Sequence, residues 1–184
     1  RFRNVTGVQT CALPIWSYRL APTCNPAVPQ CGSGTVYRDL NLKGAIFYLC
    51  GGTYNVNTIA MTSGAQIRVL NSATDDPTGI CAGFYGPTMI NVNGAASPGP
   101  WLNTNQAAID FTGETLSNPS MSAANFKMLY ARDAEVRVTG GAGSAALVYA
   151  PSASVKLTGS ATFYGAIVGY TFTSSGGADI SYDR

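Results

Sequence analysis

Carboxylates are the residues of this sequence best suited to acid–base chemistry or to calcium binding. The sequence has nine Asp and Glu residues and no histidine, which excludes a histidine base or a nucleophile activated by histidine. A polysaccharide-degrading β-helix enzyme would need clustered carboxylates around its substrate. Only Asp75 and Asp76 are adjacent, and Pro77 follows them, a pattern typical of a turn. We therefore expect no catalytic residue, no metal site and no cofactor, and an enzyme is the least favoured interpretation.

The cysteines are the other residues with chemistry of their own. Cys11 belongs to a stretch that does not resemble natural protein, which leaves Cys24, Cys31, Cys50 and Cys81. This even number suggests disulfides formed in an oxidising compartment. Of the three possible connectivities we favour Cys24–Cys31 with Cys50–Cys81, because these pairs close the shortest loops. Four reduced thiols are the alternative, since the apolar run around Cys50 also suits a buried thiol. The irregular spacing argues against zinc.

Residues 1–16 are a probable artefact. Residues 5–15 resemble the translation of a common sequencing-library adapter, and such a segment has no part in a fold. Without residues 1–16, nine Lys and Arg residues balance nine Asp and Glu residues, so the net charge falls from +2 to zero. A neutral chain without a basic run is not expected to bind nucleic acid or to lie on a membrane surface.

Membrane attachment would need a segment that this sequence does not contain. No apolar run approaches the roughly 18 residues of a membrane span. We therefore expect any attachment to come from a missing N-terminal helix. Charged residues make up only 11% of the chain, against about 25% in ordinary soluble domains, while hydrophobic residues reach 46%. This mixture favours a β-rich domain located outside the cell, on its surface or in the periplasm.

A short repeat organises the second half of the sequence. Residues 128–140 recur as residues 147–159, and a third, shorter copy follows at 172–180. Within each copy apolar residues alternate with polar ones, as in a strand with one buried face. Glycine follows each short strand, where it allows the chain to turn a corner. Units of this kind bury their apolar face only by stacking on one another.

These features predict an all-β fold, a parallel β-solenoid (β-helix-like) with short coils of 17–19 residues. We expect Val136, Val138, Val155 and Leu157 to point inward. A β-sandwich with similar strands is the alternative. Residues 17–36 are predicted to form a Cys- and Pro-rich N-terminal loop, and residues 37–184 one solenoid domain. Residues 97–119 are polar and are expected to leave the solenoid as a loop excursion, with Trp101 and Phe111 folded back onto it. A turn is expected near residues 120–125.

One row of side chains could bind a ligand on the surface. The repeat places Arg137 and Lys156 one coil apart on an outer face, and it places Tyr130 and Tyr149 at equivalent positions. Ladders of aromatic and basic side chains can bind glycans or anionic polymers. The alternative is a solvated charged face with a tyrosine stack that stabilises the coils. Tyr130, Tyr149, Arg137 and Lys156 are therefore a possible surface ligand ladder.

The chain resembles a family in two segments. Residues 147–159, 163–169 and 178–183 resemble the C-terminal solenoid-like domain of bacterial PilX-type pilus-assembly proteins of the type IV system. Residues 44–52 and 64–70 are more loosely similar to Tad/Flp pilus proteins. The resemblance implies a passenger domain that a hydrophobic N-terminal helix holds outside the membrane, and it implies no catalytic residues.

The sequence thus favours a structural, surface-exposed passenger module of a pilus-associated or secreted bacterial protein. Its expected partners are pilus components or a surface glycan. A glycan-binding or adhesive β-solenoid is the alternative function.

Overall fold

The computed structural model describes residues 17–20, 36–94, 107–112, 115–140, 143–160 and 162–182, and of residues 17–20 and 36–39 it describes the backbone alone. The probable artefact, Trp101 and the predicted pair Cys24–Cys31 lie outside the described residues. The described part consists of strands and one turn of 3-10 helix, with no α-helix. The elements are β1 (Ser17–Leu20), β2 (Val36–Lys43), β3 (Ile46–Cys50), β4 (Gly52–Thr62), β5 (Gln66–Leu70), β6 (Thr88–Val92), β7 (Ile109–Asp110), β8 (Thr115–Ser117), η1 (Ala123–Asn125), β9 (Phe126–Tyr130), β10 (Val136–Gly140), β11 (Ala145–Gly159), β12 (Phe163–Ser175) and β13 (Ile180–Ser181).

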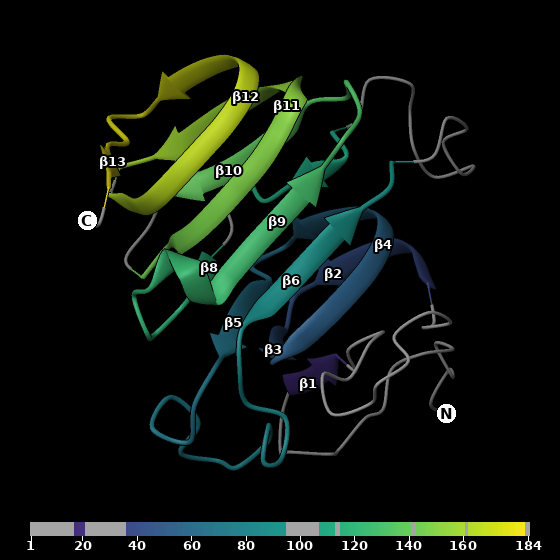
Figure 1. Ribbon diagram of the computed structural model, residues 1–184, viewed down its shortest axis with the longest axis vertical. Helices are drawn as coiled ribbons and strands as arrows, with labels where there is room; N and C mark the ends of the chain where they lie inside the picture. Colours follow the sequence, from purple (N-terminus) through teal and green to yellow (C-terminus); the bar gives the residue numbers. More distant parts are fainter. Residues whose placement is uncertain are drawn as a thin grey trace.

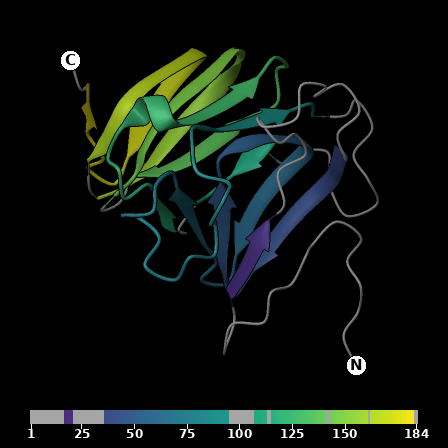
Figure 2. The ribbon, with the colours of Figure 1, turned by 60° about the horizontal axis from the view of Figure 1, so that its bottom comes forward.

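Every strand pairing in this part of the chain is parallel, and the pairs form three ladders (Figure 1). Ladder 1 joins β1, β3, β5 and β8. Ladder 2 joins the first half of β4 to β6, β9, the first halves of β11 and β12, and β13. Ladder 3 joins most of β2 to the second half of β4, then to β7, β10 and the second halves of β11 and β12. In ladder 2 the strands follow one another in chain order toward the C-terminus, as Figure 2 also shows.

The register of the repeat is confirmed in ladder 3. Arg137 pairs with Lys156, and Lys156 pairs with Thr173, which are the same offsets that relate the three copies in the sequence. The predicted inward side chains, Val136, Val138, Val155 and Leu157, are each at most 1% exposed. The predictions of an all-β fold and of parallel stacking of the repeats are therefore confirmed.

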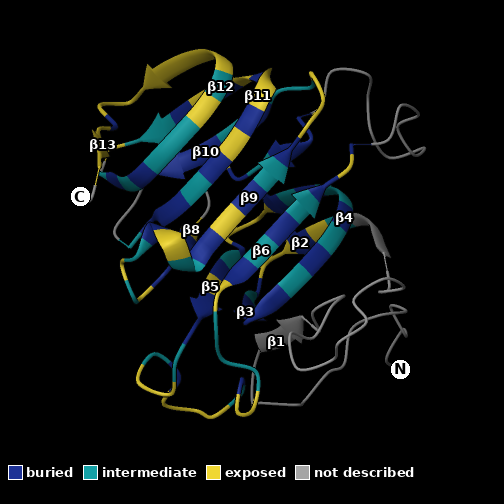
Figure 3. Cartoon of the chain, viewed as in Figure 1, coloured by how far each residue is buried: buried dark blue, intermediate teal, exposed yellow. Residues whose placement is uncertain are grey.

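Inward side chains form continuous columns along the ladders. Since parallel strands lie about 4.8 Å apart, each inward residue rests on its counterpart in the next strand. These columns merge into one main apolar core, visible as buried bands that alternate with more exposed ones in Figure 3. One column of ladder 3 runs through Leu40, Ile59, Ile109, Val136, Val155 and Phe172.

Two predicted boundaries need correction. β7 and β8 lie within residues 97–119, where we expected a loop excursion, and β1 lies within the loop predicted for residues 17–36. Strands of two to four residues are too short to show alternation in the sequence. β7 is held in place because it pairs with β4 on one side and β10 on the other. The predicted turn near residues 120–125 is confirmed by η1, and Phe111 is fully buried, as expected.

Two paired glycines in ladder 3 approach each other so closely that one of them has no room for a side chain. Gly159 pairs with Gly140 and has φ +119°, and a Cβ atom at Gly159 would overlap the carbonyl oxygen of Gly140. Gly177 also has a positive φ, +75°, but a Cβ there would meet nothing within 4 Å.

We predict that Gly159→Ala destabilises the protein much more than Gly177→Ala. Positive φ alone costs an alanine about 1–2 kcal/mol, and Gly159→Ala adds the overlap with the neighbouring strand. Urea unfolding should show the difference in free energy. Equal losses of unfolding free energy in the two variants would mean that the close approach of the Gly140 backbone does not exclude a side chain at Gly159.

Candidate functional site

Arg137, a member of the predicted ligand ladder, is held in an ion-pair cluster. Its Nη1 atom lies 3.0 Å from Asp110 Oδ2, and its Nη2 atom lies 2.6 Å from Glu135 Oε2. Its Nε atom donates a further hydrogen bond to Glu135. The hydrogen bonds from Arg137 to Glu135 are the main cause of a raised pKa for Arg137. All three guanidinium nitrogens are thus engaged within the protein, which leaves Arg137 poorly placed to hold an anionic ligand.

Lys156 and Tyr149 are exposed, as predicted, but they lie on different ladders of β11. Tyr149 pairs with Val168 in ladder 2, whereas Lys156 pairs with Thr173 in ladder 3. The register shifts between these segments, around residues 150–154. The two side chains therefore do not form one continuous surface row.

Tyr130 is buried, which corrects the prediction that it lines the surface with Tyr149. Tyr149 pairs with Leu129, so Tyr130 is one residue out of step and points to the opposite face. Its side chain is only 3% exposed, and its hydroxyl accepts a hydrogen bond from the Ala134 backbone N–H at 3.2 Å. Burial raises the pKa of Tyr130. Tyr130 is a core residue that supports the turn after β9.

The corners, which are the short segments between ladder 2 and ladder 3, differ in length, and this difference explains why Tyr130 was wrongly predicted to lie on the surface. Residues 131–135 separate Tyr130 from the inward Val136, whereas residues 151–154 separate the inward Ala150 from Val155. The first corner is one residue longer. An ungapped alignment of the two copies is therefore correct after the corner and slips by one residue before it, which moves every side chain to the other face.

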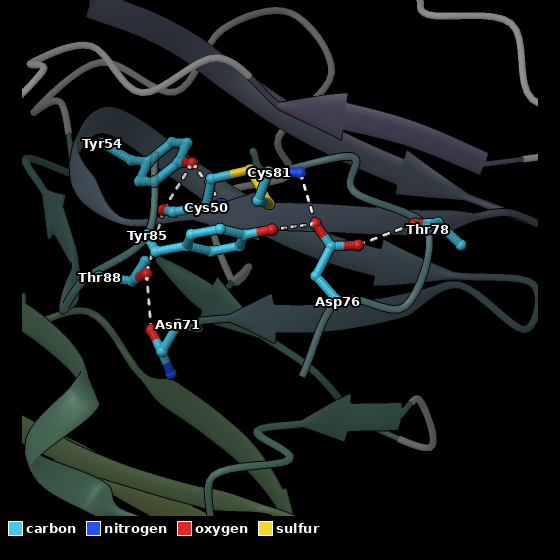
Figure 4. The surroundings of a disulfide bond; sticks show 8 residues. All are labelled: Cys50, Tyr54, Asn71, Asp76, Thr78, Cys81, Tyr85 and Thr88. Carbon is cyan, nitrogen blue, oxygen red and sulfur yellow. Dashed lines mark hydrogen bonds between the residues drawn. A yellow bond between two sulfur atoms is a disulfide. The ribbon is translucent and has the colours of Figure 1, made fainter. Parts of the chain in front are cut away.

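Cys50 and Cys81 form a disulfide, as predicted (Figure 4). Their Cα atoms lie 5.4 Å apart, and both residues are fully buried. The bond anchors the loop formed by residues 71–87 to the end of β3. A second, smaller apolar cluster forms around the bond, and it contains Tyr48, Cys50, Leu70 and Cys81. Four of the five residues of β3 are buried, and they divide between the two apolar clusters, which explains the uninterrupted apolar run in its sequence.

Asp76 organises the disulfide-anchored loop. Its side chain accepts hydrogen bonds from the Cys81 backbone N–H at 2.7 Å, from Thr78 Oγ1 at 2.8 Å and from the Tyr85 hydroxyl at 3.3 Å (Figure 4). Burial acts to raise the pKa of Asp76, but these hydrogen bonds outweigh it and lower the pKa below its ordinary value of 3.8. Asp75 accepts a hydrogen bond from Ser72 Oγ. Both carboxylates thus stabilise the turn, as the sequence indicated.

A chain of buried polar side chains, which the sequence analysis missed, links successive strands near the same loop. Thr88 Oγ1 donates to the Cys50 carbonyl at 3.1 Å. Asn71 Nδ2 donates to Asn118 Oδ1 at 3.2 Å, and Asn118 Nδ2 donates to the Ala145 carbonyl at 3.0 Å. The only sequence signal was that asparagine directly follows both β5 and β8. These groups satisfy one another and the backbone, so we assign them a structural role.

The part of the chain that the structure describes contains no group of three His, Cys, Asp or Glu residues placed to hold a metal ion. Among the same residues, no helix has the length and apolar character needed to cross a membrane.

Together these features define an all-β protein of parallel strands that carries a disulfide-anchored loop. A family model, the domain of unknown function DUF7305, matches residues 92–184. Because this span is just over half of the 184-residue chain, the chain belongs to that family. The matched span runs from the end of β6 through β13 and excludes the disulfide. No curated protein matches the chain, and no solved structure matches it either.

Removing the disulfide should destabilise the protein strongly. The two cysteines are separated by 31 residues, and closing a loop of that length is worth about 3–4 kcal/mol by chain entropy. We expect the double variant Cys50→Ala, Cys81→Ala to lose about this much free energy of unfolding in urea. Thr74→Ala, an exposed change in the same loop, serves as the control. An unchanged midpoint in the double variant would contradict the anchoring role.

Asp76 should make the stability of the protein depend on acidic pH. Because its pKa is lowered on folding below the ordinary value of 3.8, its contribution is complete well above that ordinary value and is lost as the pH falls through the folded-state pKa. The stability difference between wild type and Asp76→Asn should therefore shrink with falling pH. Thermal melts between neutral pH and pH 2 would measure it, with the exposed Asp133→Asn as the control. Parallel pH curves for wild type and Asp76→Asn would refute the assignment.

Proposed function

We propose that this chain is a parallel β-solenoid that acts as a structural, surface-exposed module of a pilus-associated or secreted bacterial protein, without catalysis. The order of the strands supports the solenoid. The chain passes from ladder 1 to ladder 2 to ladder 3 through β3 and β4, and again through β5, β6 and β7. It repeats the same order through β8, β9 and β10. A chain that visits three parallel ladders in a constant order winds as a coil.

The observation that chiefly supports a structural role is the set of apolar columns that run through successive coils. The side chains of Ile59, Ile109, Val136 and Val155 are at most 1% exposed, so each coil is stabilised by its neighbours rather than arranged around a ligand. The polar groups that stand out are likewise engaged within the protein. Arg137 pairs with two carboxylates, and Asp76 binds its own loop.

The proposed location rests on the disulfide and on the family resemblance. A buried disulfide is consistent with folding in an oxidising compartment, such as the periplasm or the extracellular space. The association with pili rests only on the resemblance of residues 147–159, 163–169 and 178–183 to PilX-type proteins. A glycan-binding ladder is less well supported, because Tyr130 is buried and Arg137 is paired.

Labelling of intact cells would test the proposed function. An antibody raised against the purified chain should label intact cells that produce the protein, and the protein should appear in the surface fraction released by shearing. A cytosolic protein that is labelled only after permeabilisation serves as the control. If labelling of this protein also required permeabilisation, the surface role would be excluded.

A further inference from the structure

The apolar column of ladder 3 ends uncovered at the C-terminal side. Val155 is 1% exposed, but Phe172, which continues the same inward column, is 47% exposed. Ladder 2 ends in a similar way, because Phe163 is fully buried beneath Ile180, and Ile180 is itself 42% exposed. Inward side chains are thus half exposed where no further strand among the described residues covers them.

β12 also has a free backbone edge at this end. Its partner on that side, β13, pairs only with Phe163 and Tyr164. From Gly165 to Ser175 the described residues provide no strand on that side. An exposed edge of this length offers unpaired N–H and C=O groups to another strand.

This edge lacks the usual protection against pairing with another chain. Natural edge strands are commonly protected by charged residues or proline. Residues 157–178 contain no Asp, Glu, Lys, Arg or Pro. The bulge between Ala150 and Ser154 lies on the opposite side of β12, where it pairs with β11.

Large exposed apolar side chains gather on the same end of the molecule. In the described part of the chain, five of the seven such residues lie within residues 168–182. A patch of this kind commonly marks an interaction surface. Its members are Val168, Tyr170, Phe172, Ile180 and Tyr182.

We propose that this end binds a second copy of the chain, with β12 of each copy pairing antiparallel across a two-fold axis. An uncharged edge does not repel its own copy, and it offers nothing to complement a charged partner. A second copy also brings an unpaired edge of equal length. A two-fold arrangement uses the same patch on both copies and is closed.

The opposite end of the ladders is not a suitable partner surface. At that end β2 carries the exposed Lys43, and neither of its inward residues is exposed as Phe172 is, since Leu42 is only 1% exposed and Leu40 is partly buried against the core. An uncovered column therefore does not face a head-to-tail neighbour there. This difference between the two ends favours tail-to-tail dimers over open filaments.

The inward residues define the register of the pairing. Ile167 is inward, because it pairs with the buried Val148, and Phe172 is inward, because it pairs with Val155. Directly opposite residues of two antiparallel strands lie on the same face. An axis between Gly169 and Tyr170 places Phe172 opposite the partner's Ile167, so that each open column is covered by an inward side chain of the other copy.

Sedimentation velocity on the whole 184-residue chain, with free thiols alkylated, would test the dimer. We expect wild type to sediment as a dimer and Val168→Lys as a folded monomer with an unchanged circular dichroism spectrum, because the new charge lies on the exposed edge. The matched control is Tyr149→Lys, which changes an outward residue on the neighbouring strand paired with Val168. This control should remain a dimer.

Three results would overturn the proposal: a wild-type monomer at every soluble concentration, dimers of Val168→Lys as stable as those of wild type, or open-ended growth with concentration. The register has its own test. The double variant Ile167→Cys, Phe172→Cys should form covalent dimers on oxidation, whereas each single variant should not. Equal cross-linking of the single variants would exclude an axis between Gly169 and Tyr170.

Discussion

Parallel backbone pairing between equivalent residues of neighbouring strands is the constraint on which the rest of this structure depends. Side chains alternate along a strand, so a slip of one residue would turn a buried row outward. The column from Leu40 to Phe172 keeps its register across every strand of ladder 3. Even β7, with only two residues, follows it, because β4 and β10 hold β7 from both sides.

Variation is confined to the corners and loops, where it does not disturb the register. The corner between ladders 2 and 3 has five residues after Tyr130, four after Ala150 and two after Gly169. The largest of the described loops, residues 71–87, is inserted between β5 and β6 and folds over Tyr48 and Leu70. A disulfide and the buried Asp76 hold this loop, so it brings a small core of its own. Loops supported in this way can change while the ladders stay constant.

The distribution of charge and apolar surface gives the two ends of the described chain different properties. Arg137, Asp110 and Glu135 form ion pairs on the side of ladder 3. Residues 157–178 carry no charge, and large apolar residues become exposed from Val168 onward. A structural module with one self-complementary end is the combination that these features favour.

The strand class and the inward residues of the repeat could be predicted from the sequence, whereas for Cys50 and Cys81 it favoured one pairing among three connectivities, and the structure then showed that pairing. Alternation within the repeat is a local pattern, and the shortest-loop argument needs only the positions of the cysteines along the sequence. The burial of Tyr130 follows from the fold alone, since one extra residue at a corner reverses a side chain without changing the local pattern. Likewise, Ile109 and Leu116 occupy strands too short to show a period, and neighbouring strands alone define them. The polar chain of Asn71, Thr88 and Asn118 also requires tertiary contacts, because its partners are 17 to 47 residues apart.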